Sequence, residues 1–206
     1  MSETSPSHFD LHAKNWDKNP THAARNQAIL AAFARRLPLD GTLAALEVGC
    51  GTGELLLPLA PSLRSVLATD ASRGMIGELQ AKLAAEPRAN IRAVQFDLLD
   101  GTVLDERFDL VYSTMMLHHV PEAGRMLERM GELLKPGGRV ALVDLLTEDG
   151  SFHGDTVVPH HGFGEEQIAA LAAGVGLRLA SFETIHAIAK NNTTYPLFLA
   201  ILESAR

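Results

Sequence analysis

Three glycines at alternate positions, Gly49, Gly51 and Gly53, end an apolar run, and Glu47 lies two residues before the first of them. Glycines in such a place let the backbone turn sharply and let a ligand approach with no Cβ in the way. The apolar run reads as a buried strand, and the residues after the glycines read as a helix start. A strand, a glycine loop and a helix in this order predict a small-molecule site at the carboxyl end of a parallel strand.

Two more acidic residues follow later apolar segments. Asp70 ends the segment 64–70, where an acidic residue can accept hydrogen bonds from both hydroxyls of a ribose. The alternative is that Asp70 caps a helix predicted over 71–85. Asp97 closes the apolar segment 91–96, and its simplest role is to cap a turn before Asp100-Gly101.

The segment 145–164 concentrates ionisable side chains: His153, His160, His161, Glu148, Asp149 and Asp155. Functional loops often carry such groups on a rigid scaffold. We consider three interpretations: a solvated loop, a histidine that acts as general base or substrate partner, and a metal site. Adjacent His160 and His161 cannot easily aim both rings at one ion, whereas His153 with one of them and an aspartate could. We predict no metal site and keep the three histidines as catalytic candidates.

Several motifs resemble those of the class I S-adenosylmethionine-dependent methyltransferases. The sequence Gly-Cys-Gly-Thr-Gly after Glu47 resembles the first motif, and Asp-x-Ser-x-x-Met at 70–75 resembles the second. Phe-Asp-Leu-Val at 108–111, Leu-His-His-Val at 117–120 and Leu-Lys-Pro-Gly-Gly at 134–138 add to the similarity, which covers roughly 42–144. The Gly-x-Gly-x-Gly spacing and Glu47 disfavour a nicotinamide dinucleotide site, and no Gly-Lys-Ser/Thr supports a nucleoside triphosphate loop.

This resemblance implies S-adenosyl-L-methionine as cofactor and S-adenosyl-L-homocysteine as product. It implies that Asp97 accepts a hydrogen bond from the adenine amino group and that backbone carbonyls near Ser113 receive the methionine ammonium group. Met75 would pack beside the adenine or serve as a core methionine, and Trp16 would belong to an arm that closes over the cofactor or only packs. The predicted cofactor-binding residues are Glu47, Gly49, Cys50, Gly51, Gly53, Asp70, Ala71, Met75, Asp97, Leu98, Ser113 and Trp16.

The implied reaction is methyl transfer to a small-molecule O, N or S acceptor. Because a sulfonium methyl group is already electrophilic, the protein mainly has to position the acceptor, and no catalytic residue is compulsory. His119 joins the three loop histidines as a candidate. The alternatives are a cofactor-binding regulatory or partner protein without independent transfer activity and, less consistent with the glycine spacing, a nicotinamide-dependent oxidoreductase.

Strand and helix patterns alternate five times before the loop, which predicts a parallel sheet with helices on both faces. We expect a helix over 21–36, capped by Thr21, with Ala28, Leu30, Ala31 and Phe33 buried, and a short or bent helix over 52–60 because of Pro58. Further helices are expected over 121–134, opened by Pro121, and over 165–175. Strands over 177–186 and 194–202 have too short a linker for a crossover and should be antiparallel. With the resemblance, this gives a doubly wound, Rossmann-like α/β fold of seven strands in the order 3-2-1-4-5-7-6.

The whole chain sets further bounds. Its 206 residues fit a single methyltransferase domain, 1–206, with an N-terminal arm and helix over 1–40, a cofactor-binding core over 42–144 and a substrate-side loop, helix and terminal hairpin over 145–206. The net charge of −7 argues against nucleic acid or a membrane as partner. The only cysteine, Cys50, allows no intramolecular disulfide, and no signal peptide is apparent. We expect a cytoplasmic monomer or homodimer.

Overall fold

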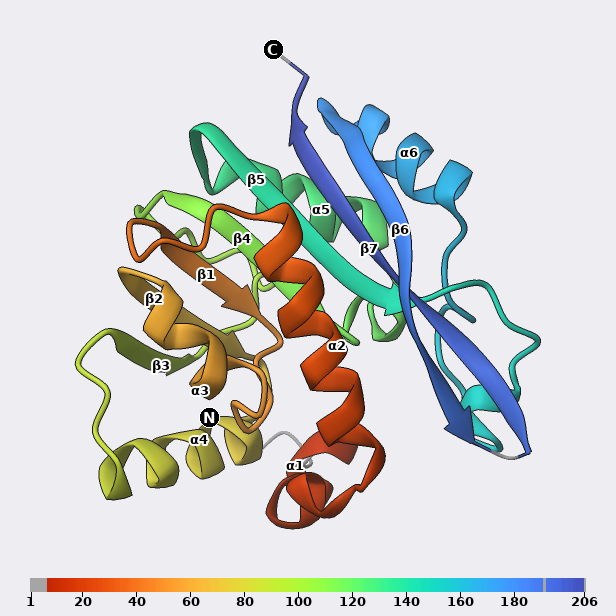
Figure 1. Cartoon of the computed structure of the whole chain (residues 1–206), viewed down its shortest axis with the longest axis horizontal. Helices are drawn as coiled ribbons and strands as arrows, with labels where there is room; N and C mark the ends of the chain where they lie inside the picture. The colour runs from red at the N-terminus through yellow and green to blue at the C-terminus, as the bar shows by residue number, and fades with distance from the viewer. Residues whose placement is uncertain (1–6, 191, 206) are drawn as a thin grey trace.

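A computed structural model describes residues 7–190 and 192–205. Its seven strands form one sheet in the order β3-β2-β1-β4-β5-β7-β6 (Figure 1). The strands are β1 (Ala44–Val48), β2 (Ser65–Asp70), β3 (Ile91–Gln95), β4 (Phe108–Thr114), β5 (Leu134–Leu145), β6 (Leu177–Lys190) and β7 (Thr193–Ser204). The first five are parallel, and β7 runs antiparallel to both β5 and β6. The predicted fold and strand order are confirmed.

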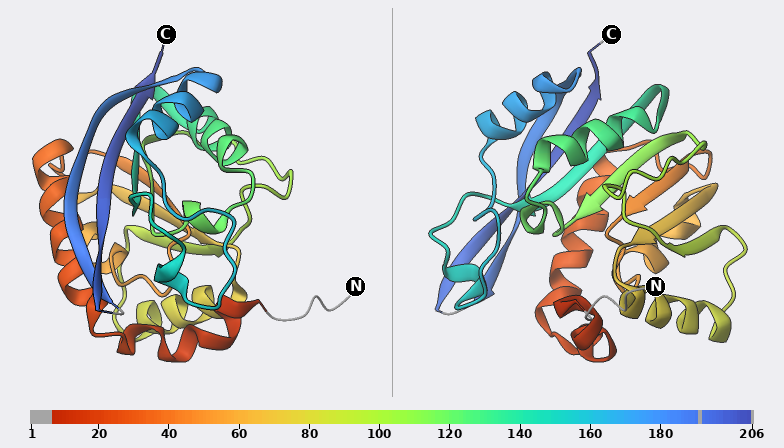
Figure 2. Two further views of the ribbon diagram at one scale, coloured as in Figure 1. Left: turned by 90° about the vertical axis from the view of Figure 1, so that its right-hand side faces the viewer. Right: turned by 180° about the vertical axis from the view of Figure 1, so that it is seen from behind.

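Helices cover both faces of the sheet, as Figure 2 shows from the side and from behind. One face carries α2 (Thr21–Arg36), α3 (Leu56–Leu59) with the 3-10 turn η2 (Ala60–Ser62), and α4 (Arg73–Ala85). The other carries α5 (Ala123–Glu132) and α6 (Glu165–Gly174). The short elements α1 (His8–His12), η1 (Ala13–Lys18), η3 (Leu117–His119) and η4 (Ser151–His153) lie in the arm and the loops. None of the described helices has the length and apolar character needed to cross a bilayer.

Four local predictions need correction. Helix α2 buries Ile29, Ala32 and Phe33 rather than Ala31, which is exposed. Asn26 and His22 continue this buried stripe one and two turns before Ile29. Thr21 does not cap this helix, since the Asn19 side chain accepts the hydrogen bond from the Thr21 amide. The remaining corrections concern element ends: α5 begins at Ala123 rather than at Pro121, and β5 already includes the segment 134–138. The predicted shortness of the helix around Pro58 is confirmed.

Candidate functional site

A cavity of about 1320 Å³ opens at the carboxyl edge of the sheet. Its lining comes from the glycine loop after β1, the end of β2, the segments after β3 and β4, and the N-terminal arm. The order of the strands reverses between β1 and β4, which is where α/β sheets of this kind open a crevice for ligands. The volume exceeds the range of about 300–1,000 Å³ typical of small-molecule sites, so two ligands can fit side by side.

The glycine loop needs its glycines for two different reasons. Gly49 has a φ of 75°, and a Cβ there would lie 2.5 Å from Met116 Cγ. Gly53 has a φ of 82° and is not part of the cavity lining, and a Cβ there would lie 2.6 Å from Leu79 Cδ1. Gly49 therefore lets the loop pass the segment after β4, while Gly53 lets α4 pack behind the loop.

Glu47 places a carboxyl group at the floor of the cavity. It is 1% exposed and accepts a hydrogen bond from the Tyr112 hydroxyl at 3.1 Å. Burial raises the pKa of Glu47 to about 8, against the lowering effect of the Tyr112 hydrogen bond, and nearby Asp70 raises it further. A buried carboxyl group with a raised pKa is prepared to receive a cationic ligand group, which would favour its ionised form.

Asp70 ends β2 and holds the glycine loop. Its Oδ2 accepts a hydrogen bond from the Gly51 amide and its Oδ1 accepts one from the Ser72 amide, both at 2.8 Å. Burial raises the pKa of Asp70, although these two hydrogen bonds lower it. Ser72, not Asp70, caps α4, because its hydroxyl accepts the hydrogen bond from the Met75 amide. The helix-cap alternative for Asp70 is therefore wrong, and the carboxylate faces the cavity.

The far end of the cavity is apolar with one acidic residue at its edge. Met75 and Leu98 are buried, and both line the cavity. Asp97 is exposed, and its Oδ1 accepts a hydrogen bond from the Leu99 amide at 2.8 Å. The turn-capping role is thus present, and it occupies one oxygen of a carboxylate that also lines the cavity.

The N-terminal arm closes one side of the cavity through two aspartates. Asp10 accepts hydrogen bonds from the Ser72 hydroxyl at 2.7 Å and the Gly74 amide at 2.8 Å, and these bonds lower the pKa of Asp10. Asp17 accepts a short hydrogen bond from the Thr52 hydroxyl and pairs with Lys82 at 2.5 Å. Trp16 lies between these two tethers and lines the cavity. Residues 1–6 of the predicted arm lie outside the described residues.

Arg25 is a lining residue that the sequence analysis missed. It reaches the cavity from α2, half-buried, and its Nε donates to the Asn26 side chain at 3.1 Å. Burial lowers the pKa of Arg25, against the raising effect of Glu54. The only sequence signal was a break in the apolar pattern of the helix, because no motif includes this residue.

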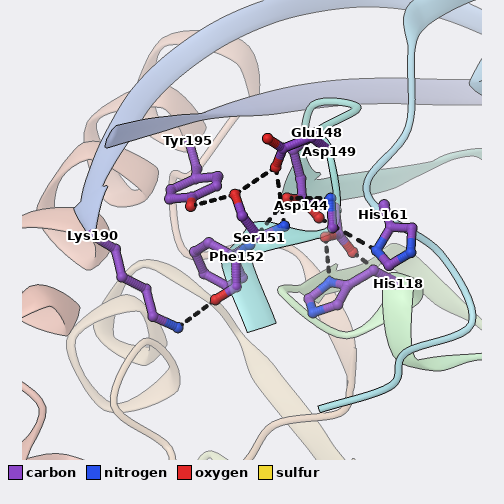
Figure 3. Close-up of polar contacts among 10 residues, drawn as sticks. His118, Asp144, Glu148, Asp149, Ser151, Phe152, His161, Lys190 and Tyr195 are labelled. Carbon is purple, nitrogen blue, oxygen red and sulfur yellow. Dashed lines mark hydrogen bonds and ion pairs between the residues drawn. The ribbon is translucent and has the colours of Figure 1, made fainter. Parts of the chain in front are cut away.

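A buried hydrogen-bonded contact between a histidine and an aspartate joins two segments that the sequence analysis had not connected. His118 in η3 and Asp144 at the end of β5 are each 1% exposed, and His118 Nδ1 lies 2.5 Å from Asp144 Oδ1 (Figure 3). Asp144 also accepts hydrogen bonds from the His118 amide at 3.2 Å and from its neighbour Leu145 at 2.7 Å. His118 lay within the Leu-His-His-Val motif, but nothing in the sequence distinguished it from His119.

His119 and His153 adjoin this pair. The centroid of the His118 ring lies 4.1 Å from that of His119 and 5.0 Å from that of His153. Burial lowers the pKa of His119 to about 3 and that of His153 to about 4, and the adjacent His118 adds to both shifts. The loop 145–164 comes close to the cavity, since His119 lines the cavity and its ring centroid lies 5.1 Å from that of His153.

The other two candidate histidines lie apart from the cavity lining. His160 Nε2 is 3.0 Å from the Val120 carbonyl oxygen, and its ring packs on Phe163. His161 is exposed, with Nδ1 3.5 Å from Glu148 Oε1. Glu148 in turn accepts hydrogen bonds from the amides of Gly150 and Phe152, so hydrogen bonds within the loop hold its turn at 148–152 (Figure 3).

Ten of the twelve predicted cofactor-binding residues line the cavity, and the two that do not are Gly53 and Ser113. Ser113 is buried one residue before the lining begins at Thr114. Cys50 lines the cavity, and burial raises the pKa of its thiol, which argues against a nucleophile.

Comparison with known proteins agrees with these motifs. A family model described as a methyltransferase domain matches residues 45–138. An uncharacterized methyltransferase of Mycobacterium tuberculosis is 35% identical over 107 residues, which are 52% of this chain and 53% of the relative. The 27-O-demethylrifamycin SV methyltransferase of Amycolatopsis mediterranei is 30% identical over 149 residues, 66% of this chain and 52% of the relative. The chain thus spans about half the length of these curated relatives.

Solved structures show the same fold at low identity. A chain in the complex of the Haloferax volcanii Trm112 methyltransferase activator with a methyltransferase gives a TM-score of 0.82 at 15% identity, with 98% of this chain and 100% of that chain covered. The DhpI–SAH complex gives a TM-score of 0.73 at 21% identity, with 96% and 93% covered.

Proposed function

Because the chain belongs to the class I S-adenosylmethionine-dependent methyltransferase family, we propose that it transfers a methyl group from S-adenosyl-L-methionine to a small-molecule O, N or S acceptor. The observation that carries this proposal is the pair of carboxyl groups, Glu47 and Asp70, that face one cavity across a glycine loop. The ammonium group at one end of the cofactor and the ribose hydroxyls at the other can each donate hydrogen bonds to a carboxyl group. Glu47 and Asp70 offer such groups near the carboxyl ends of β1 and β2.

The residues at the polar end of the cavity fit the amino-acid part of the cofactor. Glu47 offers a buried carboxyl group for the ammonium group, together with backbone carbonyls of the segment after Ser113. Arg25 offers a guanidinium group for the carboxylate, with which it can form a two-pronged ion pair. Both groups are partly withdrawn from water, so their interactions with the ligand are stronger than at an exposed surface.

The residues at the other end fit the nucleoside. Asp70 offers a carboxylate for the two ribose hydroxyls, and the remaining oxygen of Asp97 is suited to the adenine amino group. Met75 and Leu98 supply an apolar wall beside the adenine. In this arrangement, Trp16 and the tethered arm cover the cofactor from the side of the glycine loop.

The bound cofactor supplies an electrophilic methyl group, and the chain positions the acceptor and excludes water from it. Met115, Met116, Val120 and Pro121 line the cavity next to His119, so an acceptor there loses water before it meets the methyl group. His119 is neutral at pH 7 because burial lowers its pKa to about 3, and a neutral imidazole can accept a hydrogen bond from an acceptor hydroxyl or amine. Such a contact orients the acceptor for in-line attack.

The names of relatives support a small molecule as acceptor. The Amycolatopsis mediterranei relative is named a 27-O-demethylrifamycin SV methyltransferase. An Azorhizobium caulinodans relative, 34% identical over 106 residues, is named a ubiquinone biosynthesis O-methyltransferase. We favour an oxygen acceptor on this ground. A cytoplasmic location, action as a monomer or homodimer, and no nucleic acid or membrane partner are further parts of the proposal, consistent with the negative charge and the single cysteine.

The test is calorimetric titration with S-adenosylmethionine and S-adenosylhomocysteine, followed by turnover of labelled cofactor with a panel of phenols, alcohols, amines and thiols. Tight binding of both ligands and transfer to one acceptor class support the proposal, and no binding of either ligand at millimolar concentration would end it. Binding without transfer to any acceptor would favour a regulatory or partner protein. The likeness to a chain in an activator complex favours that candidate enough to repeat the assay with a co-purified partner.

A further inference from the structure

Three histidine side chains of two distant segments converge next to the cavity. One ring nitrogen from each of His118, His119 and His153 can be chosen so that the three atoms lie within 4.8 Å of one another. His118 and His119 come from η3 after β4, and His153 comes from η4 in the loop after β5. Because β4 and β5 are adjacent and parallel, their carboxyl ends bring these turns together.

Two of these rings have a buried nitrogen without a hydrogen-bond partner among the described residues. Among the described residues, none accepts or donates a hydrogen bond at His118 Nε2 or His153 Nε2, and both atoms are buried. A buried polar atom without a partner is unfavourable by about 1–3 kcal/mol, so two such atoms in one place need an explanation. A shared ligand between them would satisfy both.

Asp144 fixes the one form of His118 that can serve as a ligand. The carboxylate at 2.5 Å (Figure 3) favours the proton on Nδ1, which leaves the lone pair of Nε2 free for a ligand. Asp144 is itself oriented by the amides of His118 and Leu145. A carboxylate behind a histidine is the usual outer support of a metal-ligating imidazole.

The third histidine is held in place from the other side. His153 ends η4, where Lys190 donates to the Phe152 carbonyl at 2.6 Å and also lies over the Phe152 ring (Figure 3). Glu148 accepts hydrogen bonds from the amides of Gly150 and Phe152 in the same turn. The turn that carries His153 is therefore held by hydrogen bonds that need no ligand.

We propose that His118, His119 and His153 bind one transition-metal ion of the zinc class. Three imidazole nitrogens suit zinc, cobalt, nickel or copper rather than magnesium or calcium, which prefer oxygen ligands. Tetrahedral zinc with bonds of about 2.0–2.1 Å places its nitrogen ligands about 3.3 Å apart, so small ring rotations close the present cluster. This site replaces the histidine and aspartate set considered from the sequence, and it departs from our expectation of no metal.

Three protein ligands leave a fourth position open, as in catalytic rather than structural zinc sites. His119 belongs to both the cluster and the cavity, so this position borders the space next to the predicted methyl group. With the ion bound, the lone pair of His119 is used by the metal, so an oxygen or sulfur of the acceptor would bind at the open position as the anion instead of donating to His119, and its proton would pass to solvent. This step rests on the proposed function, whereas binding of the metal does not.

The test uses tag-free protein freed of metal by chelation and then titrated with cobalt(II) and zinc(II). We expect one equivalent of cobalt with the intense visible absorption of a tetrahedral site, displaced by one equivalent of zinc. His119→Ala and His153→Ala should each weaken binding by at least about 100-fold, and Asp144→Asn by about 10–100-fold, the effect of losing an outer partner. His161→Ala, a control in the same loop with an exposed ring, should bind like wild type.

Absence of stoichiometric binding in wild type would overturn the proposal, as would equal binding by the His119→Ala and His153→Ala variants. Since His118 and Asp144 are buried, circular dichroism must show that Asp144→Asn is folded, and the two better-exposed histidines keep the test decisive if it is not. Titration of the same samples with S-adenosylhomocysteine separates the two proposals. Zinc binding without cofactor binding would retain the metal site and reject the proposed function.

Discussion

Asp70→Ala is the substitution that tests the cofactor site most directly. The carboxylate holds the amides of Gly51 and Ser72, each at 2.8 Å, and faces the place proposed for the ribose. Loss of charge-assisted hydrogen bonds to two hydroxyls should lower the affinity for S-adenosylhomocysteine by about 1.5–3 kcal/mol, or roughly ten- to hundredfold. The two released amides should lower the free energy of unfolding as well, by about 1–3 kcal/mol.

The loss of affinity and the loss of stability can be separated with a control aspartate at the opposite edge of the sheet, which also accepts a hydrogen bond from a backbone amide. Asp109 near the start of β4 accepts a hydrogen bond from the Ala44 amide at 2.8 Å and pairs with Lys135 at 2.8 Å. Asp109→Ala should therefore reduce stability without changing cofactor affinity. Calorimetric titration gives the affinities, and urea unfolding without ligand gives the stabilities. The reasoning is refuted if folded Asp70→Ala binds S-adenosylhomocysteine as tightly as wild type, or if Asp109→Ala weakens binding equally.

Three further substitutions test the electrostatics and shape of the cavity. The free energy of unfolding of wild type relative to Glu47→Gln should fall as pH rises from about 4.5 to about 8. Over this range the raised pKa of Glu47 keeps it protonated in the folded state, whereas the unfolded state ionises. A constant difference between the two proteins in urea unfolding across this range would contradict this. Gly49→Ala should lower stability by about 1–3 kcal/mol more than Gly101→Ala, since both have positive φ but only the Cβ at 49 meets a neighbouring side chain, at 2.5 Å; equal melting temperatures would count against it. Arg25→Gln should weaken binding of S-adenosylhomocysteine but not of methylthioadenosine, which lacks the amino-acid part. Arg35→Gln, a control on the same helix, should change the affinity for neither ligand. Equal losses of affinity for both ligands in a titration would show that Arg25 does not bind the cofactor carboxylate.

The half of the cavity formed by the glycine loop and Asp70 was predictable because local sequence determines it. Gly49 and Gly51 have φ values of 75° and 55°, a conformation that side chains rarely adopt, so the need for glycine is visible in the sequence itself. Asp70 ends a strand that is recognisable by its apolar residues, and the parallel order of strands then brings it beside the glycine loop. Strand order follows from the alternation of strands and helices with right-handed crossovers.

The histidine cluster was not predictable in the same way. His118 and His153 are 35 positions apart, and their contact depends on how the turns after β4 and β5 are aimed. The decisive partner, Asp144, ends an apolar strand, where it looked like any strand-terminal residue. Arg25 was missed for a related reason, because the face of α2 that points to the cavity includes polar residues that an apolar pattern does not reveal.

Topology explains why the two groups of residues should act on different ligands. The glycine loop, Asp70 and Asp97 follow β1, β2 and β3, which lie on one side of the point where strand order reverses. The clustered histidines follow β4 and β5 on the other side. A cofactor that spans the ends of β1 to β3 and touches the backbone just after β4 therefore leaves η3 and the end of β5 for the acceptor. On this division, His153→Ala should change transfer to the acceptor while cofactor affinity stays within about half a kcal/mol of wild type, and a large loss of cofactor affinity would show that the division is wrong.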